Sequence, residues 1–176
     1  MLIFPPVSYT KHMENWSERD NWQRKSGEHR RDYKRLLERG DRKAMLEHLP
    51  ELHTEAFSNI SCLDCAGCCT GYSPRFKTPD IKRISKHLRM KEGAFIEKFL
   101  RIDEEGDYVL QSLPCPFLGQ GNACTIYEDR PSDCRRFPYT DEDVFFKRPA
   151  ITLKNAEFCP AVFYVLEKMR TLLQKG

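Results

Sequence analysis

The sequence lacks several features that would place it in a familiar class of protein. It contains no apolar run approaching the roughly 18 residues that a membrane-spanning helix needs, so we expect no membrane span. Met1 to Val7 is apolar, but it carries neither a basic region nor a small-residue cleavage site, and we expect no signal peptide. The absence of an export signal favours a cytoplasmic location.

Motifs of several enzyme classes are absent as well. The chain has no phosphate-binding loop of the form G-x-x-x-x-G-K-S/T or G-x-G-x-x-G, and it lacks the C-x-x-x-C-x-x-C spacing of radical enzymes that use S-adenosylmethionine. It contains neither internal repeats nor low-complexity tracts. The sequence therefore does not support a hydrolase or an NTPase, and it leaves open whether the protein is an enzyme.

The sequence also lacks a large excess of charge of one sign. The 29 basic and 26 acidic residues leave a net charge of only +3, and this excess lies between Lys11 and Glu47. Acidic residues such as Glu28, Asp32 and Glu38 alternate with the basic ones there, which favours a solvated helical face. We therefore do not expect nucleic acid as a partner, and the sequence indicates no particular protein partner.

What the chain does have is eight cysteines, all of them between Cys62 and Cys159. Eight in 176 residues is below the roughly 8–10% cysteine content of small disulfide-rich proteins. In a reducing cytosol, clustered thiols bind metals or take part in catalysis more often than they form disulfides. Disulfides and buried, unreactive thiols are the alternatives. None of the five histidines lies inside a cysteine motif, so the predicted metal ligands are cysteines alone.

The first cluster, Cys62-x-x-Cys65-x-x-Cys68-Cys69, has the spacing of a metal-binding loop. A gap of two residues lets two thiolates face one ion, and Gly67 and Gly71 permit the backbone bends that this requires. Three cysteines at this spacing hold three corners of a four-iron cluster in bacterial ferredoxins. Adjacent side chains point in different directions, so Cys68 and Cys69 are not expected to be terminal ligands of one ion. One of them is a bystander, or the pair serves or bridges two centres.

The other four cysteines are dispersed over the second half of the chain. Two of them precede proline, which stiffens the chain after a ligand and also occurs in ferredoxin motifs. Spacing does not select four ligands from eight thiols, and two centres of four thiols each remain an option. The predicted metal ligands are therefore all eight cysteines: Cys62, Cys65, Cys68, Cys69, Cys115, Cys124, Cys134 and Cys159.

Two arginines near Cys134 are predicted to interact with the bound cofactor. Thiolates on a metal cluster make a site anionic, and the guanidinium groups of Arg130 and Arg135 would offset that charge. The alternative is a local ion pair between Arg130 and Asp133.

Three segments carry a combined pattern that covers about residues 60–160. They are Cys62-x-x-Cys65-x-Gly67-Cys68-Cys69, Cys115-Pro116-Phe117-Leu118 and Cys124-x-Ile126-Tyr127-x-x-Arg130-Pro131-x-x-Cys134-Arg135-x-Phe137-Pro138. Together they resemble the YkgJ-type cysteine-cluster family, a zinc- or iron-chelating domain with the motif CxxCxxCC. The cysteine domain of flagellin lysine N-methylases is similar to a lesser degree, although such enzymes are larger.

The resemblance implies a metal site but no particular reaction, since members of the family are described as metal-chelating and often as iron–sulfur proteins. We therefore expect a small cytosolic protein whose cysteines hold an iron–sulfur cluster of the 4Fe–4S type, with a structural role and redox chemistry as a second option. Zinc is the alternative cofactor, in an interaction module without chemistry. A third hypothesis, suggested only by the flagellin methylases, is a protein-modifying enzyme.

The pattern of apolar residues predicts a mainly α fold with a short β-hairpin and a long irregular segment, 112–140, that a metal would order. Two domains are expected, a basic helical arm over 1–58 and a cysteine-cluster domain over 59–176. Within the arm, Asp41 is the expected N-cap of a helix that Pro50 interrupts.

Local signals also predict elements in the second domain. Three helices are expected. The first has Thr78 as its N-cap, the second begins near Ala94, and the third begins at Pro160. A short strand is expected over Tyr108 to Leu110, and a hairpin or an extended arm over Val144 to Leu153.

Overall fold

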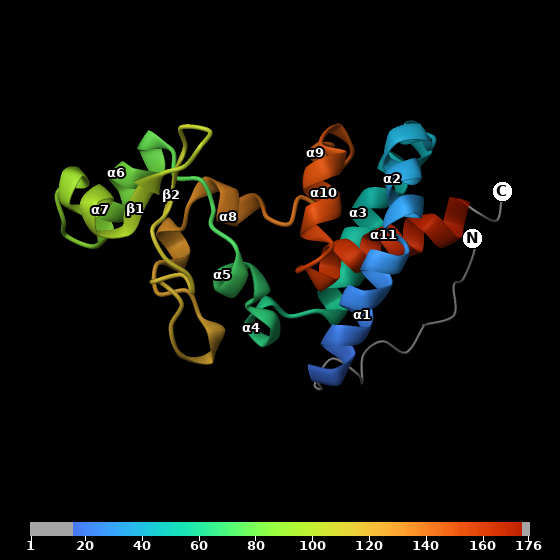
Figure 1. Ribbon diagram of the computed structural model, residues 1–176, viewed down its shortest axis with the longest axis horizontal. Helices are drawn as coiled ribbons and strands as arrows, with labels where there is room; N and C mark the ends of the chain where they lie inside the picture. The colour runs from blue at the N-terminus through green and yellow to red at the C-terminus, as the bar shows by residue number, and fades with distance from the viewer. Residues whose placement is uncertain (1–15, 174–176) are drawn as a thin grey trace. The chain divides into compact units, whose positions relative to one another are not determined.

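A computed structural model describes residues 16–173 of the chain (Figure 1). Met1 to Val7, and with them the predicted absence of a signal peptide, lie outside the described residues. The chain divides into two compact units, which we call the helical unit (Met1–Ser61 with Thr140–Gly176) and the cysteine unit (Cys62–Tyr139). The boundaries of these units differ from those of the predicted domains, 1–58 and 59–176. The domain division stays a prediction.

The helical unit is built around its last helix. α11 (Pro160–Leu173) packs against α3 (Arg42–Asn59), α2 (Arg30–Arg39) and α1 (Trp16–Glu28). Its residues from Ala161 to Leu166 are all buried, and its start at Pro160 confirms the predicted helix. The apolar faces of the other helices close on it with Trp22, Tyr33, Leu36, Leu37, Met45, Leu49, Leu52 and Ala56.

The start of α3 confirms the predicted N-cap. Asp41 accepts hydrogen bonds at Oδ1 from the backbone N–H groups of Lys43 (3.0 Å) and Ala44 (3.1 Å), which have no partner within the helix. The predicted interruption at Pro50 is wrong, because α3 continues to Asn59. Leu49 and Leu52 are buried on either side of the proline, and this packing outweighs the loss of one helical hydrogen bond.

The predicted hairpin or extended arm over Val144 to Leu153 is also wrong. The structure has two short helices there, α9 (Val144–Lys147) and α10 (Pro149–Asn155). Phe145, Phe146 and Leu153 are buried, and Pro149 occupies the first turn of α10. The buried Thr152 hydroxyl donates to the Phe145 carbonyl over 2.7 Å, which joins the two helices. Tertiary burial has therefore overridden the strand preference of the β-branched residues.

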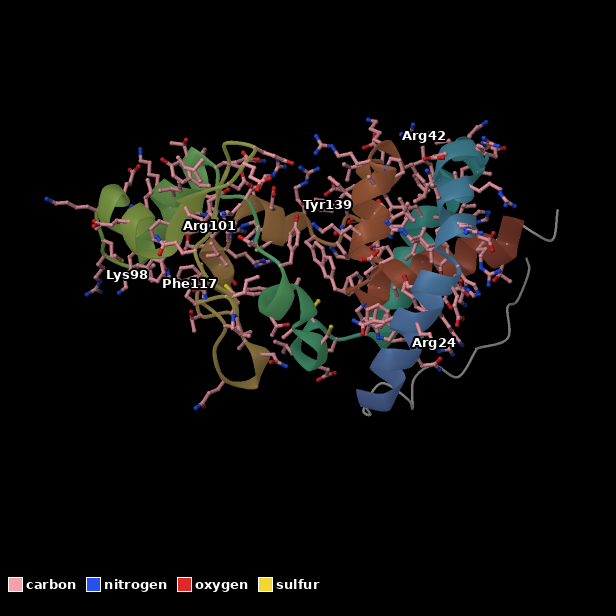
Figure 2. All side chains as sticks on the ribbon, viewed as in Figure 1. Arg24, Arg42, Lys98, Arg101, Phe117 and Tyr139 are labelled. Atoms are coloured by element: carbon pink, nitrogen blue, oxygen red, sulfur yellow. The ribbon has the colours of Figure 1, made fainter. Side chains whose placement is uncertain are left out.

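The cysteine unit places its core beside a small sheet. α6 (Thr78–His87) and α7 (Glu92–Phe99) pack together, and α7 leads directly into β1 (Leu100–Ile102). β1 pairs antiparallel with β2 (Tyr108–Leu110), in the register Arg101 opposite Val109. Phe117, labelled in Figure 2, stacks on Phe95 and contacts Phe99. The core residues are Phe76, Ile81, Ile84, Phe95, Leu100, Leu110, Phe117 and Ile126.

These elements confirm the predicted strand over Tyr108 to Leu110 and the helices near Thr78 and Ala94. The N-cap of α6 is Lys77 rather than Thr78, which forms the first helical residue ahead of Pro79. The long segment 112–140 contains only η1 (Gln120–Asn122), η2 (Tyr127–Asp129) and α8 (Ser132–Arg136). The protein is thus mainly α with a short hairpin, as expected. Within the described residues, no helix combines the length and apolarity needed to cross a membrane.

Candidate metal centre

The first four cysteines lie on two very short helices. α4 (Cys62–Cys65) and α5 (Gly67–Gly71) are separated by Ala66, whose φ of 46° places it in the left-handed region. The bend between the helices is therefore at Ala66, while Gly67 and Gly71, which the sequence suggested would permit the bends, are the first and last residues of α5 and do not have a positive φ. The CxxCxxCC segment therefore turns between its second and third cysteines.

Two hydrogen bonds bring the later cysteines to this segment. The backbone N–H of Cys115 donates to the carbonyl of Cys69 over 2.7 Å, and the Asn122 side chain donates to the carbonyl of Leu63 over 2.6 Å. Between these points the chain doubles back, with Leu118 opposite Cys124 in an antiparallel bridge. Cys115 and Cys124 are thus held beside α4 and α5, at the edge of the apolar core.

Cys69 affects the ionisation of several of the other thiols. Its Sγ is 3.9 Å from the Sγ of Cys68, and this hydrogen bond lowers the pKa of Cys69 to about 7 against the opposing effect of burial. Burial is the main reason why the pKa of other thiols is raised, to about 11 for Cys115 and about 12 for Cys134. The charge of Cys69 adds to the rise in pKa at each of four cysteines: Cys62, Cys115, Cys124 and Cys134.

The donor chemistry of this group fits a thiophilic metal. Several thiols whose charges disfavour one another become compatible once a cation binds them as thiolates, and thiolates suit both zinc and iron–sulfur clusters. In the part of the chain that the structure describes, no three cysteine, histidine or acidic side chains stand close enough to hold one ion. Within the described residues, none of the eight cysteines takes part in a disulfide. The structure therefore shows a gathering of metal-binding groups rather than a closed coordination sphere.

The arrangement of cysteines agrees with a comparison against protein families. Residues 61–160 match the family described as "CxxCxxCC: Putative zinc- or iron-chelating domain". The chain belongs to this family. Metal binding is accordingly the function that the family supports for the cysteine-rich segment. No curated protein and no solved structure matches the chain.

The family match extends to Cys159, which lies in the helical unit. Cys159 is buried directly before α11, and its backbone N–H donates to the carbonyl of Asn155 over 2.8 Å. The other seven cysteines all belong to the cysteine unit. Of the eight ligands predicted from the sequence, seven therefore belong to the cysteine unit and one, Cys159, belongs to the helical unit.

The two arginines predicted near the cofactor are both bound to the turn that precedes Cys134. The Arg130 guanidinium lies 3.7 Å from the centre of the Tyr127 ring and donates to the Tyr127 carbonyl over 2.7 Å. Its charge lowers the pKa of Cys124, against the larger effect of burial. Arg135 donates to the carbonyls of Arg130 (3.2 Å) and Glu128.

The structure also reveals polar residues near Cys134 that the sequence did not single out. Asp133 pairs with Arg75, whose Nε is 3.2 Å from Oδ2, rather than with Arg130. Asp80 and Arg83, on α6, bind the backbone around Ser132 and Arg130. In the sequence Asp80 is only an acidic residue in the first turn of a helix, and nothing local connects it with Cys134, which lies more than fifty positions later.

Proposed function

We propose that this member of the family is a cytoplasmic protein whose cysteines hold an iron–sulfur cluster of the 4Fe–4S type. The observation that carries the proposal is the hydrogen bond from the backbone N–H of Cys115 to the carbonyl of Cys69 (2.7 Å), which brings cysteines from separate parts of the chain together. The ferredoxin-like spacing of the first cysteines favours iron–sulfur chemistry over a single zinc ion. The cluster would hold the unit together, with electron transfer or oxidant sensing as a second role.

The proposed ligands come from the CxxCxxCC segment and from the irregular segment that follows. Cys69 is the central candidate, since it influences the thiols of Cys115, Cys124 and Cys134 as well as that of Cys62. All eight cysteines remain predicted ligands, in one centre or two. Arg130 would supply the positive charge that offsets an anionic cluster, as its effect on the pKa of Cys124 supports.

A structural role is proposed because segment 112–140 has little regular secondary structure. Its regular elements are no longer than five residues, and they are joined by irregular backbone. Bonds from cysteines to a metal would connect this segment to α4 and α5, so that metal binding and folding of the cysteine unit would be coupled.

The test is anaerobic purification followed by a UV–visible spectrum and analysis of iron, zinc and acid-labile sulfide on the same sample. We expect a broad band near 400 nm with iron and sulfide in about equal amounts. A colourless protein that contains zinc would contradict the cluster and support the alternative, a zinc-stabilised interaction module. That alternative is kept because the family description names both zinc and iron.

A further inference from the structure

Asp80 is a buried carboxylate that joins two elements of the cysteine unit. Only 2% of its surface is exposed, and it lies in the first turn of α6. Oδ1 accepts from Arg83 Nη2 (2.8 Å) and from the backbone N–H of Ser132 (3.0 Å). Oδ2 accepts from the backbone N–H of Lys77 (3.2 Å) and from the Ser132 hydroxyl (3.0 Å). One side chain thus caps its own helix and binds the start of α8.

The start of α8 has no capping side chain of its own. The residue before it is Pro131, which has no polar side chain, and the first N–H groups of any helix have no intrahelical acceptor. Asp80 supplies that acceptor for Ser132 from another element. α8 is five residues long, which is too short to be stable alone, and its third residue is Cys134.

Two further contacts join the same parts of the chain. Arg83 Nη2 donates to the carbonyl of Arg130 over 2.9 Å while it pairs with Asp80. Arg75 Nε lies 3.2 Å from Oδ2 of Asp133, the residue directly before Cys134. The chain on the N-terminal side of Cys134 is therefore held by residues 75–83 at Arg130 and Ser132 through the backbone and at Asp133 through its side chain.

From these contacts we propose that Asp80 is a positioning residue for Cys134, which it holds in place for binding the metal. The inference rests on the proposed function, because it takes Cys134 to be a ligand. Asp80 does not touch the metal. It fixes the first turn of α8 through Ser132, and so sets the direction of the Cys134 side chain two residues later.

The test compares D80N with D103N. Asp103 is a matched control in the same unit, since its Oδ1 also accepts two backbone N–H groups, those of Glu105 (3.0 Å) and Asp107 (2.9 Å), in the turn between β1 and β2. In the metal-loaded proteins, we expect D80N to release metal to a chelator about 10- to 100-fold faster than wild type. D103N is expected to release metal at the wild-type rate.

A second readout uses the metal-free protein and does not depend on metal content. D80N should increase hydrogen exchange at Ser132 and the rate at which N-ethylmaleimide labels Cys134, followed by mass spectrometry. A loss of stability shared by the whole unit would also raise labelling of Cys115 and Cys124, whereas loss of positioning raises labelling of Cys134 alone. Equal labelling of Cys134 in D80N and D103N overturns the proposal.

Ser132→Ala keeps the proposal testable if D80N does not fold. It removes the hydroxyl contact with Asp80 and leaves α6 unchanged, so metal release should change in the same direction and by less. A wild-type rate of metal release in S132A, or in D80N where that variant folds, overturns the role of Asp80 while leaving the metal centre intact. Failure of the proposed function is recognised separately, because wild-type protein would then contain zinc or no metal in place of iron and acid-labile sulfide.

Discussion

At the scale of single residues, Glu167 is a heavily hydrogen-bonded carboxylate of the helical unit. Its Oε1 accepts from Tyr33 (2.6 Å), His29 (2.7 Å) and Arg170 (2.9 Å), which joins α2 to α11. Although burial opposes ionisation, these hydrogen bonds lower the pKa of Glu167 to about 2. The ionised form is therefore favoured in the folded state relative to the unfolded chain.

The lowered pKa of Glu167 predicts acid-sensitive stability. A carboxyl group with a depressed folded-state pKa stabilises the protein above its unfolded pKa, near 4.5, and this contribution is lost as pH falls toward 2. We expect E167Q to lower the free energy of unfolding at pH 7 by about 2 kcal/mol and to flatten its dependence on pH in this window. Chemical unfolding followed by tryptophan fluorescence measures this, because Trp16 and Trp22 both belong to the helical unit.

E157Q is the control for this prediction. Glu157 also pairs with an arginine, Arg30, but about half of each side chain is exposed, and such pairs contribute roughly 0–1 kcal/mol. An equal loss of stability in E157Q and E167Q, or an unchanged pH profile in E167Q, would contradict the assignment.

A second prediction at this scale concerns the adjacent pair Cys68 and Cys69. The ferredoxin spacing takes Cys68 as the third ligand after Cys62 and Cys65, whereas in the structure it is Cys69 whose carbonyl accepts from the backbone N–H of Cys115, one of the later cysteines. We expect C69S to lose most of its bound metal and C68S to keep more than half of it. Metal content per chain after anaerobic purification decides this, and the opposite ranking would restore the assignment based on spacing.

At the scale of secondary-structure elements, the cap of α3 offers a test that is independent of the metal. Asp41→Ala removes the acceptor for the N–H groups of Lys43 and Ala44, so we expect a loss of about 1 kcal/mol in the free energy of unfolding. Asp41→Ser should retain most of the stability, because serine also caps helices well. Urea unfolding compares the three proteins, and an equal loss in both variants would mean that the cap is not the cause.

The elements that could be predicted are those whose signals are local. Asp41 caps the helix that follows it directly, and Pro160 begins a helix whose apolar residues recur at helical spacing. α9 and α10 could not be predicted in this way. They are four and seven residues long, and burial of Phe145 and Leu153 against distant helices holds them in place.

The same distinction applies to the candidate site. Thiol spacing and the family resemblance pointed to the cysteines, because those signals are contained in short stretches of sequence. The roles of Asp80 and Arg75 depend on the fact that α6 and the chain before it lie beside α8, which no local pattern reveals. Residues that position a ligand were therefore missed, although the ligands themselves were proposed.

At the scale of the whole molecule, metal removal should affect the two units differently. We expect a chelator under reducing conditions to increase hydrogen exchange throughout segment 112–140, because few regular elements hold that segment in place. Exchange in α3 and α11 should stay unchanged, since the apolar packing of the helical unit contains no proposed metal ligand other than Cys159. Hydrogen–deuterium exchange with mass spectrometry measures both. Unchanged protection of 112–140 would rule out a structural role for the metal.

The division of the helical unit between the two parts of the chain, 1–61 and 140–176, has a consequence for synthesis on the ribosome. α1 to α3 emerge first, but α11, against which they pack, is made only after the whole cysteine unit. At a translation rate of about 5–20 residues per second, the apolar faces of α1 to α3 would stay without α11 for on the order of ten seconds. The cysteine unit is complete earlier, so metal insertion can precede closure of the helical unit during translation.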